Sequence, residues 1–249
     1  MFELDQVCKR FGEVTALDRF NLSIEAGRTT VLIGPSGCGK STVLRLMIGL
    51  QCPDSGEVRF NNERLDGDRI TAQRRRMGYV IQDGGLFPHL SAHDNIALMA
   101  CYLGWTAPRM EDRICELADL THFPMEALDR FPVQLSGGQQ QRVSLMRALM
   151  LDPEVLLLDE PLGALDPMIR FELQEDLKSV FSALGKTVVL VTHDLAEAAF
   201  FGDTIILMRD GRIVQAGTLD AMMREPAEDF VQNFIKAQRS HLSPEVLRR

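Results

Sequence analysis

The stretch Gly34-Pro35-Ser36-Gly37-Cys38-Gly39-Lys40-Ser41 matches the spacing G-x-x-x-x-G-K-[ST] at every defined position. It follows residues 29–33, a β-branched run that predicts a strand, and it precedes residues 41–50, where apolar residues recur at helical spacing. A strand, a glycine-rich loop and a helix in this order bind phosphates, because glycines allow close approach and the helix N-terminus supplies positive potential. The stretch therefore predicts a nucleotide site in an α/β fold.

Single residues of this loop have predictable tasks at a nucleotide. Lys40 would reach the β- and γ-phosphates, the Ser41 hydroxyl would bind Mg²⁺, and the Thr42 backbone would help to hold the α-phosphate. Cys38 lies beside Lys40 near a helix N-terminus, and both features favour a thiolate. We therefore expect maleimide to modify Cys38 before the other cysteines, with a buried, inert thiol as the alternative. The predicted ATP-binding residues of the loop are Gly34, Pro35, Ser36, Gly37, Cys38, Gly39, Lys40, Ser41 and Thr42.

Two carboxylates, Asp159 and Glu160, close the apolar strand pattern of residues 155–158. Adjacent carboxylates are costly at a strand end unless they are solvated, paired or bound to a metal. With a phosphate loop upstream, Asp159 would hold Mg²⁺ through its water shell, and Glu160 would orient and deprotonate the attacking water. Alone, the pair is equally compatible with a solvated turn.

Gln82 and His193 each follow a further predicted strand, residues 78–81 and 188–191. Taken alone, Gln82 is an ordinary polar residue at a strand end, and a lone histidine such as His193 is more often structural. Parallel strands bring their carboxyl ends to one edge of a sheet, where α/β proteins bind ligands. We therefore expect both residues to meet the phosphate at this edge.

The pentapeptide Leu135-Ser136-Gly137-Gly138-Gln139 contains a capping box, in which Ser136 caps the helix that begins at Gly137. A capping box does not require two glycines at the start of a helix, where they weaken it. Glycines there let a phosphate approach bare amides at a helix N-terminus. The chain therefore carries a second candidate phosphate site in addition to the loop at Gly34–Ser41.

The phosphate loop, the acidic strand end and this pentapeptide together resemble the ATPase subunits of ABC transporters, from Phe2 to about Phe234. In that family the signature of one subunit, here Leu135–Gln139, closes on the γ-phosphate bound to the other. A head-to-tail dimer then sandwiches two ATP molecules. The resemblance implies a homodimer with two competent sites, ATP and Mg²⁺ as cofactors, and ATP hydrolysis coupled to transmembrane transport.

The resemblance also assigns roles to single residues. It makes Gln82 the Q-loop glutamine, which touches Mg²⁺ and the lytic water, and His193 the switch histidine, which contacts the γ-phosphate. Residues 163–166 become the D-loop, with Asp166 crossing the dimer interface. Phe11 takes the place of the tyrosine on which the family usually stacks adenine, and a core position for Phe11 is the alternative. The implied metal-binding residues are Ser41, Gln82 and Asp159, and the implied catalytic residues are Glu160, His193 and Gln82.

Apolar strands that alternate with helices predict a parallel sheet covered on both faces. Strands are predicted at residues 20–24, 29–33, 78–81, 155–158 and 187–191, with a hairpin around Asp210-Gly211. Helices are predicted at residues 41–50, 92–103, 108–120, 137–151, 167–184 and 194–201. With the resemblance, the fold class is α/β: a P-loop NTPase with an ABC-type RecA-like core, an N-terminal antiparallel β subdomain and an inserted helical subdomain. The predicted ATPase domain spans residues 1–238, its helical subdomain about 88–152, and a short tail 239–249.

The charge and cysteine content narrow the function classes. The formal net charge of −8 argues against nucleic acid as the main partner. The five cysteines lack CxxC spacing, which predicts neither a disulfide framework nor a zinc site. The N-terminus shows no signal-peptide pattern, and the longest apolar runs are strand-sized. We therefore expect a peripheral protein on the cytoplasmic face of a membrane, where another chain supplies the spanning part.

Residues 83–89 join a strand to the helical part, and in the family this region receives a coupling helix of the permease. An exposed tip at Leu86–His89 would form an apolar contact for such a partner. Residues 78–82, 85–89 and 94–98 look most like the ATPases of quaternary-amine importers for glycine betaine, choline or carnitine. The expected partners are a permease and, indirectly, a solute-binding protein. An importer of an amino acid or other small solute, and a soluble or signalling ABC ATPase, are the alternatives.

Overall fold

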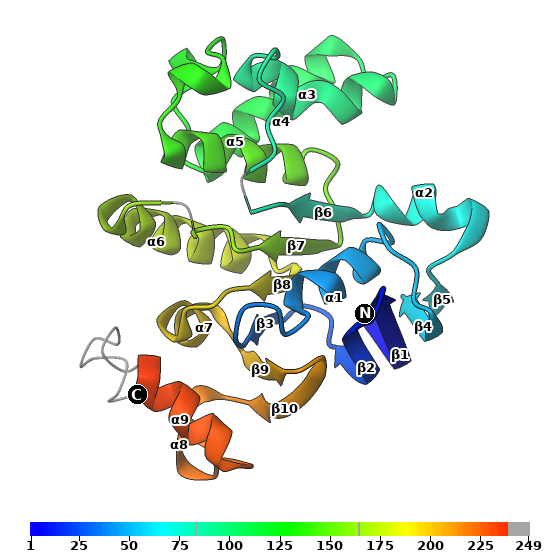
Figure 1. Cartoon of the computed structure of the whole chain (residues 1–249). Coiled ribbons are helices and arrows are strands. Elements are labelled where there is room, and N and C mark those ends of the chain that lie inside the picture. Colours follow the sequence, from blue (N-terminus) through cyan, green and yellow to red (C-terminus); the bar gives the residue numbers. More distant parts are fainter. Residues whose placement is uncertain (83, 164, 239–249) are drawn as a thin grey trace. The chain divides into compact units, whose positions relative to one another are not determined.

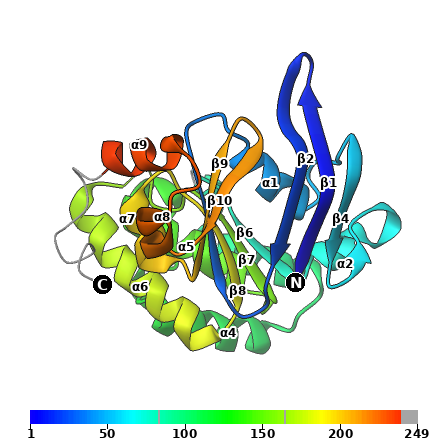
Figure 2. The same ribbon diagram turned by 90° about the horizontal axis from the view of Figure 1, so that it is seen from below.

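The computed structural model describes residues 1–82, 84–163 and 165–238. Its chain divides into two compact units: unit 1 comprises Met1–Arg74 and the chain from Thr187 onward, and unit 2 comprises Arg75–Lys186. The predicted tail 239–249 lies outside the described residues. The predicted bounds of the ATPase domain and of its helical subdomain stay predictions. Figures 1 and 2 label the elements of each unit.

Unit 1 contains an antiparallel sheet with the strand order β2-β1-β4-β5. Its strands are β1 (Phe2–Phe11), β2 (Val14–Ile24), β4 (Ser55–Phe60) and β5 (Glu63–Arg64). Phe2 pairs with Ile24 on one side and with Phe60 on the other, and the ring centroids of Phe2 and Phe60 lie 4.9 Å apart. In Figure 2 β1 and β2 form the long blue hairpin. The expected antiparallel part at the N-terminus is confirmed.

Unit 1 also contains strands in the order β10-β9-β3-β8. They are β3 (Thr29–Ile33), β8 (Thr187–Val191), β9 (Thr204–Arg209) and β10 (Arg212–Gly217). β3 is parallel to β8 and to β9, every residue of β3 and β8 is buried, and β10 returns antiparallel as the predicted hairpin. The helices of this unit are α1 (Lys40–Met47), α2 (Ile70–Arg74), α7 (Leu195–Phe201), α8 (Leu219–Arg224) and α9 (Asp229–Gln238).

Unit 2 combines two parallel strands, β6 (Met77–Val80) and β7 (Val155–Asp159), with four α-helices among its described residues. The helices are α3 (Ala92–Tyr102), α4 (Ala107–Leu120), α5 (Gly137–Leu149) and α6 (Pro167–Leu184). α3 packs against α4 and α5, and α5 packs against β6. The predicted helices of this region are confirmed: α6 has the predicted bounds, and α3, α4 and α5 each differ at one end by one or two residues. Within the described ranges, no helix combines the length and the apolar character needed to cross a membrane.

Candidate nucleotide-binding and catalytic site

The predicted phosphate loop lies in unit 1, between the end of β3 and the start of α1. Gly34, Gly37 and Gly39 have φ angles of 147°, 80° and 107°, which L side chains rarely adopt. A Cβ atom on Gly34 would lie only 2.2 Å from the carbonyl oxygen of Met208 in β9. The loop therefore needs glycine at this position for its packing against β9, independently of any phosphate.

Lys40 is the first residue of α1, and its side chain is buried, with a relative exposure of 6%. Its ammonium donates to the carbonyl oxygens of Gly34 at 2.8 Å and Pro35 at 3.0 Å. A buried ammonium needs such acceptors, since its desolvation is otherwise costly. Because the ammonium lies within the turn of the loop, phosphate oxygens there would compete with these carbonyls for its three protons.

The expectation of a reactive Cys38 is wrong. Cys38 has a relative exposure of 4%, and burial raises the pKa of its thiol. The nearby Lys40 acts to lower this pKa but does not cancel the effect of burial. The proximity to a cation and to a helix N-terminus was correctly inferred, since the Lys40 nitrogen lies 3.8 Å from the sulfur. Desolvation of the thiolate outweighs both features. Cys38 is therefore the buried thiol that stood as the alternative.

Phe11 ends β1 and is 48% exposed, so the alternative of a core position is wrong. The ammonium of Lys9 lies 5.6 Å from the centroid of its ring. An exposed aromatic face beside a cation is compatible with the predicted stacking on adenine.

His193 follows β8, at the edge of unit 1 from which the phosphate loop also leaves. β3 and β8 pair through Leu32 and Val191, and the Thr192 amide donates to the Leu32 carbonyl oxygen at 3.2 Å. The structure therefore brings His193 and the phosphate loop to the ends of two neighbouring parallel strands, as the sequence predicted.

Two residues that the sequence analysis did not single out hold the backbone around His193. The buried carboxylate of Glu197 accepts a hydrogen bond from the Thr192 hydroxyl at 2.6 Å. The Gln238 side chain donates to the His193 carbonyl oxygen at 2.7 Å. The pattern Asp194-x-x-Glu197 was a visible capping signal, but nothing local in the sequence links Gln238 to His193.

Gln82, Asp159 and Glu160 lie together in unit 2. β6 and β7 pair in parallel with Val80 opposite Leu158, so Gln82 and Glu160 leave the two strands at the same edge. Asp159 is buried, with a relative exposure of 5%. Glu160 has a φ of 46°, a left-handed conformation that non-glycine residues seldom adopt. Such conformations cluster at active sites, which supports the hypothesis of a catalytic role for Glu160.

The predicted signature begins α5, and its capping box is present. The Ser136 hydroxyl accepts from the Gln139 amide at 3.3 Å, and the Ser136 amide donates to the Gln139 side chain at 3.0 Å. Gly138 is buried, and a Cβ atom there would lie 2.8 Å from a methyl carbon of Ile169 in α6. Packing against α6 therefore explains why position 138 is a glycine. Ser136 and Gly137 are exposed, so the predicted approach of a phosphate to them stays open.

Asp166, the predicted D-loop aspartate, caps α6. Its carboxylate accepts hydrogen bonds from the amides of Met168 at 3.1 Å and Ile169 at 3.2 Å. These bonds fix the side chain locally. Within the predicted D-loop, Ala164 lies outside the described residues.

The predicted partner surface at Leu86–His89 precedes α3. Phe87 is 43% exposed, its ring lies 6.0 Å from that of His89, and Leu86 is half-buried. The fully buried Asn95 holds this tip: its side-chain oxygen accepts from the Phe87 amide at 2.8 Å, and its Nδ2 lies within 3.1 Å of the carbonyl oxygens of Phe87, Leu90 and Ser91, two of which its two protons can reach at a time. The exposed ring thus stands on a fixed backbone. Asp83, the first residue of the predicted segment, lies outside the described residues.

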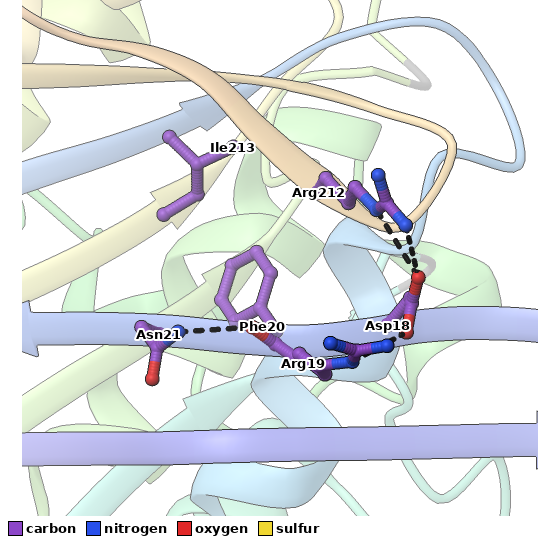
Figure 3. Close-up of a pocket in the computed structure, with 6 residues that line it drawn as sticks. All are labelled: Asp18, Arg19, Phe20, Asn21, Arg212 and Ile213. Carbon is purple, nitrogen blue, oxygen red and sulfur yellow. Dashed lines mark hydrogen bonds and ion pairs between the residues drawn. The ribbon is translucent and has the colours of Figure 1, made fainter.

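A separate pocket of about 440 Å³ lies in unit 1 along β2 and β10 (Figure 3). None of the predicted site residues lines it. Arg212 and Asp18 form its charged wall through hydrogen bonds from the guanidinium to one carboxylate oxygen, and these bonds hold the pKa of Asp18 below its usual value. The pocket's main cation and anion therefore satisfy each other.

The donors predicted for Mg²⁺ fit a hard cation. Ser41 in unit 1 offers a hydroxyl, and Gln82 and Asp159 in unit 2 offer an amide and a carboxylate. Mg²⁺ prefers such oxygen ligands together with water and substrate phosphates. Asp159 is the only carboxylate of this set, and its burial at a strand end suits a group that meets a cation.

A family model described as "ABC transporter" matches residues 17–163. The glycine betaine uptake system ATP-binding protein YehX of Escherichia coli is 47% identical over 234 residues, which cover 94% of this chain and 76% of YehX. The glycine betaine/carnitine/choline transport ATP-binding protein OpuCA of Bacillus subtilis is 43% identical, and the match covers 96% of this chain but 63% of OpuCA.

A solved structure extends the similarity to the fold. The ATP-binding cassette MJ0796, in a dimeric post-hydrolysis state bound to ADP and Pi, superposes with a TM-score of 0.79 at 36% identity. The superposition covers 88% of this chain and 99% of that chain. The predicted fold class is confirmed by this agreement.

Proposed function

The chain belongs to the ATP-binding subunits of ABC transporters, and from this premise we propose that it hydrolyses ATP as a head-to-tail homodimer to drive solute import through a separate permease. The observation that carries the proposal is the presence of two anion-type helix N-termini in one chain. One follows the phosphate loop at Lys40, and the other is the exposed start of α5 at Ser136 and Gly137. A nucleotide held between two subunits would use both.

In this proposal the residues of unit 1 bind the nucleotide. Phe11 stacks on adenine, the loop amides and Lys40 hold the phosphates, and His193 contacts the γ-phosphate. The buried hydrogen bond between Thr192 and Glu197 supports a fixed position for His193. The start of α5, from Ser136, contacts the γ-phosphate that the other subunit binds.

The residues of unit 2 act on water. Glu160 is the general base that takes a proton from the attacking water, and Gln82 is the group that orients this water. Ser41 of unit 1, together with Asp159 and Gln82, would hold Mg²⁺, which would neutralise charge on the phosphates. We assign the ATPase domain to residues 1–238, with residues 88–152 as its helical subdomain.

The role of Glu160 is tested by Glu160→Gln, with Glu154→Gln as the matched control. Glu154 lies just before β7, pairs with Arg76 and sits at the opposite end of the same strand. We expect Glu160→Gln to bind ATP normally but to lose roughly 10²- to 10⁴-fold in kcat, the usual loss for a general base. Glu154→Gln should retain the wild-type rate. A near-normal ATPase rate in Glu160→Gln contradicts the assignment.

For the solute, we assign a quaternary amine, with support from the names of the relatives and from the sequence segments 78–82, 85–89 and 94–98. The test is uptake of labelled glycine betaine by source cells with and without the gene, at high osmolarity. Glycine, which lacks the three methyl groups, is the matched control solute. Loss of betaine uptake alone agrees with the assignment, and loss of glycine uptake alone indicates an amino-acid importer.

The permease contact is assigned to the tip at Leu86–His89, because an exposed aromatic side chain there stands on a backbone fixed by Asn95. Phe87→Ser should leave ATPase activity of the isolated subunit unchanged and should reduce copurification with a multi-span membrane protein. Copurification with no membrane protein, in wild type as in Phe87→Ser, would favour the soluble or signalling alternative.

A further inference from the structure

The half-buried side chain of Arg147 bonds two backbone carbonyl groups. It lies near the end of α5, and its guanidinium donates to the carbonyl oxygens of Gly85 and Gly84, both at 2.7 Å. Among the described residues its hydrogen bonds reach only these two neutral acceptors, and burial lowers its pKa. Two bonds from one planar guanidinium to successive carbonyl groups fix the orientation of both peptide units. The contact therefore serves the backbone geometry of this loop.

A second side chain of α5 makes the same contact. The fully buried hydroxyl of Ser144 lies 2.9 Å from the Gly84 carbonyl oxygen and 3.0 Å from that of Gln140. A hydroxyl has one proton, so it can donate to one of the two at a time. The bond to Gly84 would place donors from two successive turns of α5 on the same short loop.

The loop that receives these bonds is built for them. Gly84 and Gly85 have φ angles of 67° and 59°, and the Gly84 amide donates to the Ile81 carbonyl oxygen at 2.9 Å. A Cβ atom on Gly84 would lie 2.6 Å from the Ser144 hydroxyl oxygen, and one on Gly85 would lie 2.4 Å from the Ile81 side chain. Consecutive left-handed residues thus turn both carbonyls toward α5, just after Gln82.

We propose that Arg147, assisted by Ser144, is a positioning residue for Gln82. It fixes the glycine turn that follows Gln82 to the helix that begins at the signature serine, Ser136. A shift of α5 would therefore carry the Gln82 backbone with it. This inference rests on the proposed function, since it takes Gln82 to act on the water of hydrolysis.

The test compares Arg147→Met and Arg147→Lys with the control Arg113→Met. Arg113 is also half-buried and also donates to a backbone carbonyl, that of Leu149 at 3.0 Å, but Leu149 is the last residue of α5 and not part of the loop. Lysine keeps the charge but cannot bond two carbonyls from one planar group. We expect Arg147→Met to lose roughly 10- to 100-fold in kcat, the scale of a small misplacement, with unchanged ATP affinity. The kcat of Arg147→Lys should lie between those of the wild type and Arg147→Met, and Arg113→Met should keep the wild-type kcat.

A structural role alone predicts a different result: equal losses of kcat in Arg147→Met and Arg113→Met, in proportion to their melting temperatures, would overturn the inference. Hydrogen exchange supplies an independent readout, since amides 84–86 should exchange faster in Arg147→Met only. If Arg147→Met does not fold, Ser144→Ala decides: a several-fold loss of kcat at unchanged ATP affinity supports the inference, and full activity overturns it. Absence of ATPase activity in the wild-type chain would instead contradict the proposed function.

Discussion

At the scale of single residues, burial decides the chemistry of the phosphate loop. Lys40 and Cys38 lie close together and are both buried. The carbonyl oxygens of Gly34 and Pro35 suit an ammonium, whereas burial disfavours the negative charge of a thiolate and raises the pKa of Cys38. The same surroundings therefore support the predicted role of Lys40 and oppose the predicted reactivity of Cys38.

This contrast predicts the order of cysteine modification. Cys52, Cys101 and Cys115 are exposed, and their thiols should react with maleimide before Cys38 does. Peptide mass mapping after brief labelling at neutral pH measures the order, and mild denaturation should abolish the difference. Modification of Cys38 first in the folded protein would show that the loop opens far enough to solvate its thiol.

Neighbouring residues in the sequence were enough to predict that the Lys40 side chain lies in the phosphate loop, because the loop motif itself places it there. They were not enough for Cys38. The exposure of Cys38 depends on its packing against Gly34: a Cβ atom added to Gly34 would lie only 2.9 Å from the Cys38 sulfur. Burial of this kind is a property of the folded backbone.

At the scale of elements, a histidine ties α3 to α4. The two ring nitrogens of His93 lie 2.8 Å from Glu111 in α4 and 3.3 Å from Asp94. Burial alone lowers the pKa of His93, but the bonds to Glu111 and Asp94 outweigh it, so that the pKa is raised above its usual value.

The raised pKa predicts a pH-dependent stability. Because protonated His93 is favoured in the folded state, its contribution is fully present below about pH 6.5, the unperturbed histidine pKa. It is lost as the pH rises through the higher pKa of the folded state. For a partly exposed pair we expect at most about 1 kcal/mol. Denaturation of wild type and His93→Gln across this range should show free energies of unfolding that converge at high pH, and a constant difference would contradict this account.

The sequence predicted the elements with a clear period and missed those whose period is broken. Helices α3 to α6 follow their apolar spacing closely. In β1 the buried residues are Phe2, Leu4 and Val7, because Gln6 has a φ of 47° and the pairing register shifts between Leu4 and Val7. A bulge of this kind displaces the alternation, so the strand gave no regular signal.

Contacts between distant segments were beyond the sequence for a different reason. The signature and the glycines after Gln82 were each visible as local patterns. The bonds from Arg147 and Ser144 that join them span about 60 residues of chain. They exist only because α5 packs on β6, the strand that precedes Gln82.

At the scale of the whole molecule, the central claim is that the start of α5 completes the nucleotide site of a second copy. Unit 1 carries the phosphate loop, and unit 2 carries the signature at Ser136. The net charge of −8 opposes association of two identical copies. Each bound nucleotide must therefore supply contacts that outweigh this repulsion, so we expect the dimer to depend on ATP.

The most direct measurement of this claim is the molar mass of Glu160→Gln by light scattering, with and without ATP and Mg²⁺. The account predicts a monomer without nucleotide and a mass twice as large with ATP, because the variant binds ATP without consuming it. The double variant Glu160→Gln/Ser136→Arg should bind ATP equally well but remain a monomer, since the arginine blocks approach of the phosphate of the other subunit. A double variant that dimerises as readily as Glu160→Gln would contradict the claim and leave Ser136 as a helix cap only.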